Sequence, residues 1–351
     1  MTNNVIIEKT NTGVGRITLA REKALNALSY DMIESMLTTL KSWHHDPDVH
    51  IIILEGAGEK AFCAGGDIKT LYQAREHENG IAAAKQFFTL EYELDLLIAT
   101  FEKPIIALLD GIVMGGGVGL SYGASHRIVT DQTKWSMPEM NISFFPDVGA
   151  CHFLNQSPGY AGRYAALTAA VIRGEDAMLL GAADHYVKAD VLSKLKETLL
   201  AYDWIHTPNP ENDVDELISI HETAPPESKL SKWQSEIDQH FSHETMEGII
   251  HSLEASDTDF AKETANTLRQ LSPLSLKVTL AHLQQSAHTT LKETYANDIQ
   301  LALQFLTCPD FYEGVRAVLI DKTRQPTYQY ETVEAVPDKA IVPFFATNEV
   351  R

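Results

Sequence analysis

Short apolar runs alternate with amphipathic segments along the first half of the chain. Residues 14–20 (VGRITLA) and 51–56 (IIILEG) are apolar runs of strand length, and residues 27–43 separate them. In this middle segment the apolar residues from Met32 to Leu40 recur at the spacing of one helix face, after Ser29, a residue type that caps helices. The pattern predicts an amphipathic helix between two strands.

A similar order recurs further along the chain. Residues 103–113 (KPIIALLDGIV) form an apolar run opened by Pro104, residues 119–126 (GLSYGASH) predict the start of a helix, and residues 127–131 (RIVTD) predict another strand. Repeated strand, helix and strand units are typical of α/β proteins with parallel strand pairing. We therefore predict an α/β fold for this half.

The texture of the sequence changes near residue 190. Residues 191–205 predict a helix, whereas the acidic, Pro-bearing segments 206–216 and 222–229 predict loops. Residues 230–322 predict almost continuous helix, with a helix stop at Pro273. We predict a catalytic core over residues 1–195 and a mostly helical region over residues 196–351.

Composition narrows the classes of partner. The 351 residues are 44% hydrophobic and 22% charged, which is typical of a soluble globular protein. A formal net charge of -20 disfavours nucleic acid and anionic membranes as partners, and no apolar run is long enough to span a bilayer. Three widely spaced cysteines and an N-terminus without signal or transit features predict a cytoplasmic protein.

Two glycine-rich turns follow apolar strands, at residues 61–69 (AFCAGGDIK) and 111–123 (GIVMGGGVGLSYG). Such turns direct backbone N–H groups into a small space that suits an oxyanion or a phosphate, although glycines also serve simple tight turns. Neither turn matches GxxxxGK[ST] or GxGxxG. The sequence therefore predicts no nucleotide cofactor.

Three other local patterns suggest chemistry. Residues 119–123 match the GxSxG pattern of serine hydrolases, but the glycines before them place Ser121 about one turn into the predicted helix. The segment HHDPDVH (44–50) lacks metal-ligand spacing and predicts a turn, so no metal site is expected. Cys63 lies between apolar residues and is interpreted as a small buried hydrophobe.

Two carboxylates stand in an apolar run. Glu139 and Asp147 lie in MPEMNISFFPDVGAC (137–151), which contains no Lys or Arg. Burying a charge is costly, so the two acids either form a functional site or point to solvent from a surface loop.

Taken together, these segments resemble the crotonase (enoyl-CoA hydratase/isomerase) superfamily. The matching pieces occur in the family's order: REKALNALS, AFCAGGDIK, DGIVMGGGVGLS and MPEMNISFFPDVGA, followed by LSPLSLKVTL and DFYEGVRAVLIDK. Within the superfamily the chain is most similar to the 3-hydroxyisobutyryl-CoA hydrolase subgroup. The resemblance implies a spiral of ββα units followed by a helical C-terminal part.

The resemblance also implies a substrate and a site. The substrate is an acyl-CoA, so coenzyme A is part of the substrate and no separate cofactor is expected. The N–H groups of Gly66 and Gly116 form an oxyanion hole for the thioester carbonyl, and Glu91 is an acidic substrate contact. The remaining substrate contacts implied by the family are Lys23, Ala24, Ala64, Asp67 and Ile68.

A departure from the hydratase pattern indicates the reaction. Hydratases of the family carry one glutamate three residues beyond the oxyanion glycine and a second in the PE motif, whereas this chain has Gly119 at the first position. The hydrolase subgroup instead pairs the PE glutamate with an aspartate, here Glu139 and Asp147. The resemblance implies cleavage of 3-hydroxyisobutyryl-CoA in valine catabolism, with Glu139 as nucleophile or general base and Asp147 binding the hydroxyacyl group.

Alternatives stay open at this point. The same oxyanion hole would serve an enoyl-CoA hydratase or isomerase, and a fold relative could bind acyl-CoA without turnover. Family members often assemble as trimers, so a homo-oligomer is one expectation, and a single chain whose helical part covers the same faces is the other.

Overall fold

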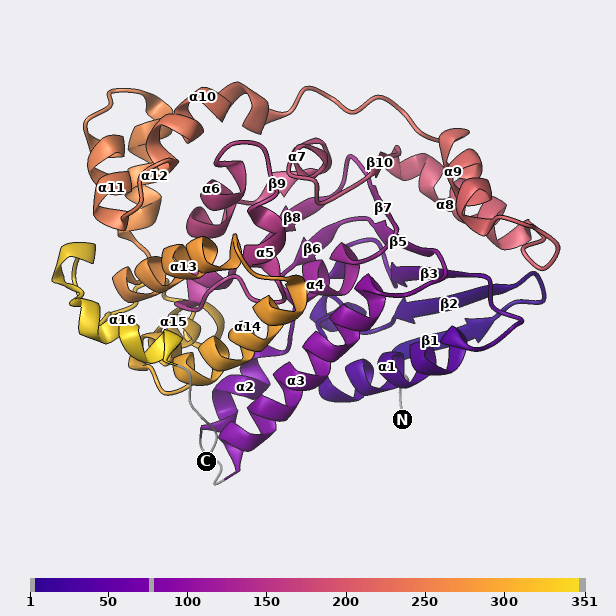
Figure 1. Ribbon diagram of the computed structural model, residues 1–351, viewed down its shortest axis with the longest axis horizontal. Helices are drawn as coiled ribbons and strands as arrows, with labels where there is room; N and C mark the ends of the chain where they lie inside the picture. The colour runs from indigo at the N-terminus through magenta and orange to yellow at the C-terminus, as the bar shows by residue number, and fades with distance from the viewer. Residues whose placement is uncertain (1–3, 76–78, 347–351) are drawn as a thin grey trace. The chain divides into compact units, whose positions relative to one another are not determined.

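The computed structural model describes residues 4–75 and 79–346, whose helices and strands are labelled in Figure 1. The chain divides into two compact units. Unit 1 comprises Met1–Gly66, Leu90–Ser136 and Val171–Ser228, and unit 2 comprises Asp67–Thr89, Met137–Ala170 and Lys229–Arg351. Each unit is thus assembled from three segments of the chain. The division predicted at residue 195 separates a strand-rich from a helix-rich stretch rather than these two units, and it stays a prediction.

All strands of the described residues belong to unit 1, where they form two sheets. The six-stranded sheet has the order β1 (Val5–Lys9), β2 (Val14–Leu19), β3 (Ile51–Gly56), β5 (Ile105–Leu109), β7 (His126–Val129), β10 (His185–Tyr186). The four-stranded sheet has the order β4 (Ala61–Cys63), β6 (Ile112–Met114), β8 (Lys134–Ser136), β9 (Ile172–Arg173). Only β1 and β9 pair antiparallel with their neighbours; the other pairs within both sheets are parallel.

From β3 to β8, successive strands alternate between the two sheets, which produces the predicted spiral. The chain passes from β3 to β4, from β5 to β6 and from β7 to β8, each time leaving the larger sheet for the smaller one. The apolar run 103–113 therefore contains two strands, divided at Gly111, whose φ of +71° suits glycine. The ββα architecture predicted from the resemblance is confirmed.

The central strands of the six-stranded sheet are buried on both faces. Residues of β3 alternate: Ile52 and Leu54 face a core shared with α1 (Tyr30–His44), whereas Ile51 and Ile53 pack with residues of α8 (Ala189–Ala201) and α9 (Pro210–Ser219). A parallel strand covered on both faces is uniformly apolar, which explains the sequence IIILEG. The predicted strands at 14–20 and 51–56 and the helix between them are confirmed.

Two predicted elements of unit 1 differ from the structure. Residues 206–216, predicted as a loop, contain most of α9, because Pro210 occupies the first helical turn and the Asn209 side chain accepts a hydrogen bond from Asn212 N–H. Proline is tolerated there, since the first N–H groups of a helix have no intrahelical acceptor. The helix α4 (Gly116–Tyr122) begins before the predicted start at residue 119. A further short helix of this unit is α7 (Gly174–Leu179).

Unit 2 is helical. It contains α2 (Ile68–Ala74), α5 (Ala150–Leu154), α6 (Ala161–Thr168), α10 (Lys229–Phe241), α11 (Met246–Glu254), α12 (Asp259–Arg269), α13 (Pro273–Ser286), α14 (Leu291–Phe305), α15 (Pro309–Val315) and α16 (Asp338–Phe345). The boundary between the units falls within α3 (Gly80–Ala99). The prediction of nearly continuous helix over residues 230–322 is confirmed.

The helix α13 lies at the centre of unit 2 and packs against α5, α6, α11 and α16. The helix stop predicted at Pro273 is wrong, because Pro273 is the first residue of α13 and the Ser272 hydroxyl caps the helix by accepting from Ser275 N–H at 3.3 Å. None of the helices in the described residues has the length and apolarity needed to cross a bilayer.

Candidate active site

Two glycine turns of unit 1 lie side by side. The first follows β4, where Gly65 has a φ of +104° and its carbonyl accepts from Leu28 N–H at 2.8 Å. The second follows β6, where Gly115 has a φ of +51° and its N–H donates to the Ser136 carbonyl at 3.2 Å. Each turn is thus held by backbone bonds to a neighbouring segment, so its conformation does not depend on a mobile side chain.

Gly66 and Gly116 lie close together. A methyl group placed on Gly116 would lie 3.2 Å from Gly66 N and would collide with Glu91 Oε1. Within the described part of the chain, neither of these two amides donates a hydrogen bond to another protein group. Two adjacent N–H groups with no protein acceptor can bind a developing oxyanion, and only glycine leaves room for one at position 116.

Two buried acids of α3 lie near this turn. Glu91 and Asp95 are 3% and 1% exposed and stand four residues apart, on one face of the helix. Burial raises the pKa of the Cys63 thiol to about 12, and the charges of Glu91 and Asp95 add to this rise against an opposing hydrogen bond from the Gly65 amide. The thiol therefore stays protonated, which supports the interpretation of Cys63 as a buried hydrophobe.

A pocket of about 550 Å³ in unit 1 is lined by the lysines Lys23 and Lys60 and by the glutamates Glu22 and Glu59, among other residues. Its wall is fixed by Asn26, which has a φ of +57° and whose side-chain amide donates to the carbonyls of Ala57 at 3.0 Å and Ala61 at 2.8 Å. The two ammonium groups and the two carboxylates balance, so the lining alone does not favour an anionic ligand. Of these residues, only Lys23 was singled out from the sequence.

Unit 2 holds Glu139 and Asp147. Glu139 begins a short 3-10 helix, Glu139–Ile142, and is 7% exposed, and Asp147 is 6% exposed. The interpretation of the two acids as solvent-facing loop residues is therefore wrong. After this helix Ser143 adopts a φ of +57°, and the Phe144 N–H donates back to the Glu139 carbonyl at 3.1 Å, so that the loop closes on itself.

The turn that carries Asp147 is strained and anchored. Val148 has a φ of +53°, which is costly for a β-branched residue, and Gly149 has a φ of +76°. The Gly149 N–H donates to Asp298 Oδ2 at 2.8 Å, and Asp298 Oδ1 lies 2.6 Å from His282 Nε2. Asp298 and His282 are fully buried, so this pair from α14 and α13 holds the turn in its strained conformation.

The Cys151 thiol lies near the acids of unit 2. Burial raises its pKa well above the ordinary value, and the negative charges of Asp298, Asp147 and Glu139 raise it further. Both predicted catalytic acids are therefore near one buried thiol, and this thiol cannot ionise to act as a nucleophile at neutral pH.

A comparison with models of known protein families identifies the family of this chain. The sequence model of the Enoyl-CoA hydratase/isomerase family matches residues 14–345. The chain belongs to this family.

Curated relatives and solved structures agree with the assignment. The chain is 39% identical over 342 residues to a protein named 3-hydroxyisobutyryl-CoA hydrolase, mitochondrial, from Gallus gallus, covering 96% of this chain and 87% of that protein. The protein of the same name from Homo sapiens is 39% identical over 344 residues, covering 95% and 86%. These relatives are named as mitochondrial proteins. For this chain, the cytoplasmic location stays a prediction.

Two solved structures share the fold over nearly their full length. A carnitinyl-CoA dehydratase from Mycobacterium thermoresistibile is 35% identical with a TM-score of 0.92, covering 100% of this chain and 98% of that chain. An enoyl-CoA hydratase from Rhodobacter sphaeroides 2.4.1 is 35% identical with a TM-score of 0.88, covering 98% and 97%.

The site residues implied by the resemblance fall into two groups. Unit 1 holds Lys23, Ala24, Ala64, Gly66, Glu91 and Gly116, and unit 2 holds Asp67, Ile68, Glu139 and Asp147. Asp67 caps α2, since its side chain accepts from Thr70 N–H at 3.4 Å. Within unit 1 the structure brings Gly66, Gly116 and Glu91 together, and within unit 2 it brings both other acids near Cys151.

Sequence reasoning missed three buried polar residues of this enoyl-CoA hydratase/isomerase family member. Asp95 had a local signal, since an acid four residues after Glu91 continues the same helix face. His282 and Asp298 had none, because they meet the Asp147 turn only through the packing of distant helices.

The serine-hydrolase alternative is not supported. Ser121 is buried inside α4, and its hydroxyl donates to the Gly117 carbonyl at 2.9 Å. A nucleophile elbow requires an exposed serine at the strand-to-helix turn, and that position is taken by Gly115 and Gly116.

Proposed function

We propose that this chain is an acyl-CoA thioesterase that hydrolyses 3-hydroxyisobutyryl-CoA to 3-hydroxyisobutyrate and CoA, a step of valine catabolism. The names of the curated relatives, at 39% identity over nearly the whole chain, support the reaction class and the substrate. The proposal needs no cofactor, since coenzyme A belongs to the substrate.

The Gly66 and Gly116 amides would polarise the thioester carbonyl. Attack on this carbonyl moves a full negative charge onto its oxygen, and a preorganised donor is worth about 3 kcal/mol in such a transition state. The proposal is supported by the adjacency of the two amides and by the absence of protein acceptors for them among the described residues.

Glu139 would supply the attack by one of two routes. As a nucleophile, its carboxylate forms a mixed anhydride as the C–S bond breaks, and water then cleaves the anhydride. As a general base, it takes a proton from water while the water oxygen attacks the carbonyl. In both routes the CoA sulfur leaves as thiolate and is protonated, and the acyl group leaves as a carboxylic acid.

One observation carries the choice of hydrolysis over hydration. The residue one turn after Gly116 is Gly119, which has no acidic side chain. Glu139 and Asp147, in contrast, are both buried, and the charge of each raises the pKa of the Cys151 thiol. Hydration of a double bond employs two acid/base groups around the α and β carbons. A carboxylate next to the acyl group instead suits the β-hydroxyl of a hydroxyacyl thioester, which can donate a hydrogen bond to Asp147.

A second candidate is an enoyl-CoA hydratase or isomerase that uses the same oxyanion hole. It is favoured by the two solved structures at 35% identity, which are a carnitinyl-CoA dehydratase and an enoyl-CoA hydratase. In that reaction Glu139 would act with Glu91 or Asp147 as an improvised second acid. A family member that binds acyl-CoA without turnover is the third candidate.

Two assays with the purified protein separate these functions. With 3-hydroxyisobutyryl-CoA we expect release of free thiol, and with crotonyl-CoA we expect no loss of the enoyl absorbance. Ser121→Ala should retain thiol release. Brisk hydration without thiol release would replace the thioesterase by the hydratase, and silence in both assays with measurable CoA binding would leave the binding protein.

A further inference from the structure

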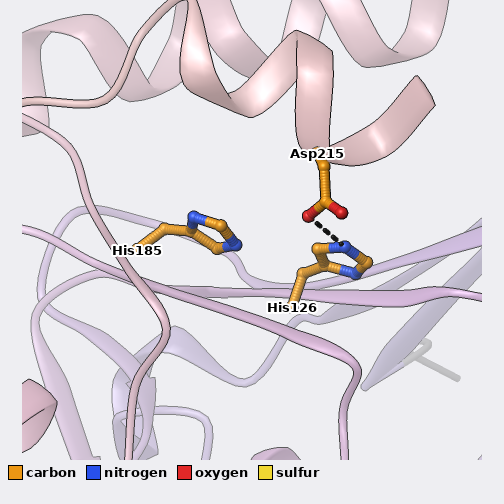
Figure 2. A group of neighbouring side chains, drawn as sticks. All are labelled: His126, His185 and Asp215. Atoms are coloured by element: carbon orange, nitrogen blue, oxygen red, sulfur yellow. Dashed lines mark hydrogen bonds and ion pairs between the residues drawn. The ribbon is translucent and has the colours of Figure 1, made fainter. Parts of the chain in front are cut away.

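Two histidines and an aspartate converge at the edge of the six-stranded sheet of unit 1 (Figure 2). His126 and His185 are the first residues of β7 and β10, which pair in parallel with His185 opposite Ile128. Their rings stack with centroids 5.8 Å apart and planes inclined by 12°. Asp215 reaches them from α9, and its Oδ1 lies 3.2 Å from His126 Nε2.

The Ser125 hydroxyl lies beside His126. It accepts from Ile105 N–H at 2.9 Å, and it lies 3.1 Å from the Ile105 carbonyl and 2.9 Å from His126 Nδ1. When this hydroxyl donates to the Ile105 carbonyl, it accepts from His126 Nδ1. In that tautomer of the neutral ring, the lone pair of Nε2 faces Asp215 and can bind a metal ion.

His185 carries a hydrogen on Nδ1. This nitrogen lies 3.1 Å from Glu222 Oε1, and a carboxylate oxygen only accepts, so Nδ1 is the donor. Figure 2 shows its other ring nitrogen turned toward His126 and Asp215. With both histidines protonated on Nδ1 alone, two imidazole lone pairs and a carboxylate oxygen, all electron donors, lie close together.

We propose that His126, His185 and Asp215 bind a divalent transition-metal ion of the zinc type. Imidazole nitrogens and a carboxylate oxygen are ligands that Zn²⁺ prefers, and Nδ1 of each histidine is held by an oxygen, as in established zinc sites. The ligand atoms lie within 4.8 Å of one another. Tetrahedral zinc with bonds of about 2.1 Å needs ligand atoms about 3.4 Å apart, so no two of these atoms have to approach by more than about 1.4 Å for the ion to bind.

The ion would tie α9 and β10 to the body of the sheet. Glu211, one turn before Asp215 on α9, adds negative charge that acts on His126. The three ligands are far apart in the sequence, since His126 and Asp215 are separated by 89 positions, and no spacing motif exists for such a set. This explains why the sequence predicts no metal site, and the assignment is independent of the proposed thioesterase reaction.

The test is a calorimetric titration of the chelator-treated full chain with Zn²⁺, repeated with Co²⁺ to follow its visible absorption. We expect one ion per chain with micromolar or tighter affinity and a Co²⁺ spectrum of high intensity. Asp215→Asn and His185→Gln should each weaken binding at least about 100-fold, and Glu222→Gln, which removes an orienting partner, about 10- to 100-fold. Both ligand variants alter partly exposed side chains, so they are expected to fold.

The matched control is His206→Gln. His206 pairs with Asp203 at 2.8 Å on the surface, with its side chain 79% exposed, and should not affect Zn²⁺ affinity. The competing arrangement, without a metal, is a hydrogen bond from His126 Nε2–H to Asp215. Absence of binding at millimolar Zn²⁺, or binding that the ligand variants leave unchanged or that His206→Gln weakens equally, would overturn the proposal in favour of that hydrogen bond.

Discussion

The two units hold their candidate site groups by different means. In unit 1 the groups are backbone amides of Gly66 and Gly116, fixed by turns that bond to neighbouring strands and segments. In unit 2 they are the side chains of Glu139 and Asp147, on a loop that contains left-handed residues and is anchored by the buried Asp298. The first arrangement is held by backbone bonds, whereas the second depends on a side chain from a distant helix.

The difference separates a conformation that nearby residues determine from one that distant residues must hold. A glycine turn between a paired strand and a helix is determined within a few residues. A strained residue such as Val148 persists only if the surroundings hold it, and here the Asp298 carboxylate binds both the next amide and His282. The following substitutions separate the two means of support, beginning with the largest expected effect.

Glu139→Gln removes the carboxylate that attacks or activates water and preserves the side-chain shape. We expect the rate of thiol release from 3-hydroxyisobutyryl-CoA to fall about 10³-fold or more, because general-base catalysis alone contributes about 10²- to 10⁴-fold. The KM should change little. A variant that retains more than a tenth of the rate would remove Glu139 from the chemistry and leave only the backbone groups of unit 1.

Gly116→Ala tests the backbone groups directly. The added methyl group would collide with Glu91 Oε1 and crowd Gly66 N at 3.2 Å, so we expect kcat to fall about 10²- to 10³-fold, as for loss of one oxyanion donor. Gly181→Ala is the matched control, since its added methyl group meets no atom within 4 Å and only its φ of +73° is unfavourable. Equal activity losses in the two variants would contradict a special role of the Gly116 turn.

Asp298→Asn tests the anchor of unit 2. The amide keeps one acceptor but loses the charge that binds His282, so we expect a loss of about 1–3 kcal/mol in the free energy of unfolding and about a tenfold fall in kcat. Urea denaturation and thiol release measure the two effects. The exposed Asp257→Asn, which removes a surface pair with Lys262, should do neither. Unchanged activity in Asp298→Asn would mean that the turn at Val148 and Gly149 keeps its conformation without the Asp298 carboxylate.

Asp184→Asn provides the corresponding test of an ion pair in unit 1. Burial alone raises the pKa of Asp184, but the hydrogen bonds and charge of Arg127 outweigh burial and hold the pKa below its ordinary 3.8. Because the folded-state pKa is lowered, the stabilisation is complete well above pH 3.8 and is lost as pH falls through the folded-state value. We expect the variant to be about 1–2 kcal/mol less stable at pH 7, with a smaller difference at pH 4. A difference that grows toward acid would contradict the assignment.

The thiols provide the smallest expected effect. Burial raises the pKa of Cys63 to about 12, and it also raises the pKa values of Cys151 and Cys308 above the ordinary 9.0. We expect no rapid reaction of the native protein with a disulfide reagent at pH 8, and three reactive thiols after denaturation. A fast-reacting thiol in the native protein would show that one of these cysteines is accessible.

Local patterns predicted the elements whose cause is local. The helix at Tyr30–His44 and the strand at Ile51–Gly56 were predicted because periodicity and continuous apolarity reflect the faces they bury. The loop prediction over residues 206–216 failed because a proline preceded by a capping asparagine starts a helix as readily as it ends one. Proline alone therefore does not distinguish these cases.

The candidate site was predicted in part for the same reason. The glycine turns and the acids Glu139 and Asp147 are contiguous motifs, so the sequence and its family resemblance pointed to them. Asp298, which pairs with His282, accepts from the Gly149 amide, 149 positions earlier in the chain. No local sequence pattern predicts a contact between residues so far apart. The same holds for the two histidines and Asp215 at the sheet edge.

The central claim is that the acid pair of unit 2 makes this chain a hydrolase of hydroxyacyl thioesters. Its most direct test compares thiol release from 3-hydroxyisobutyryl-CoA with that from isobutyryl-CoA, which lacks the β-hydroxyl, in the wild type and in Asp147→Asn. We predict that kcat/KM of the wild type favours the hydroxylated substrate about 10- to 100-fold, and that Asp147→Asn loses most of this preference. Equal hydrolysis of both substrates by the wild type, or a preference that survives in Asp147→Asn, would contradict the claim.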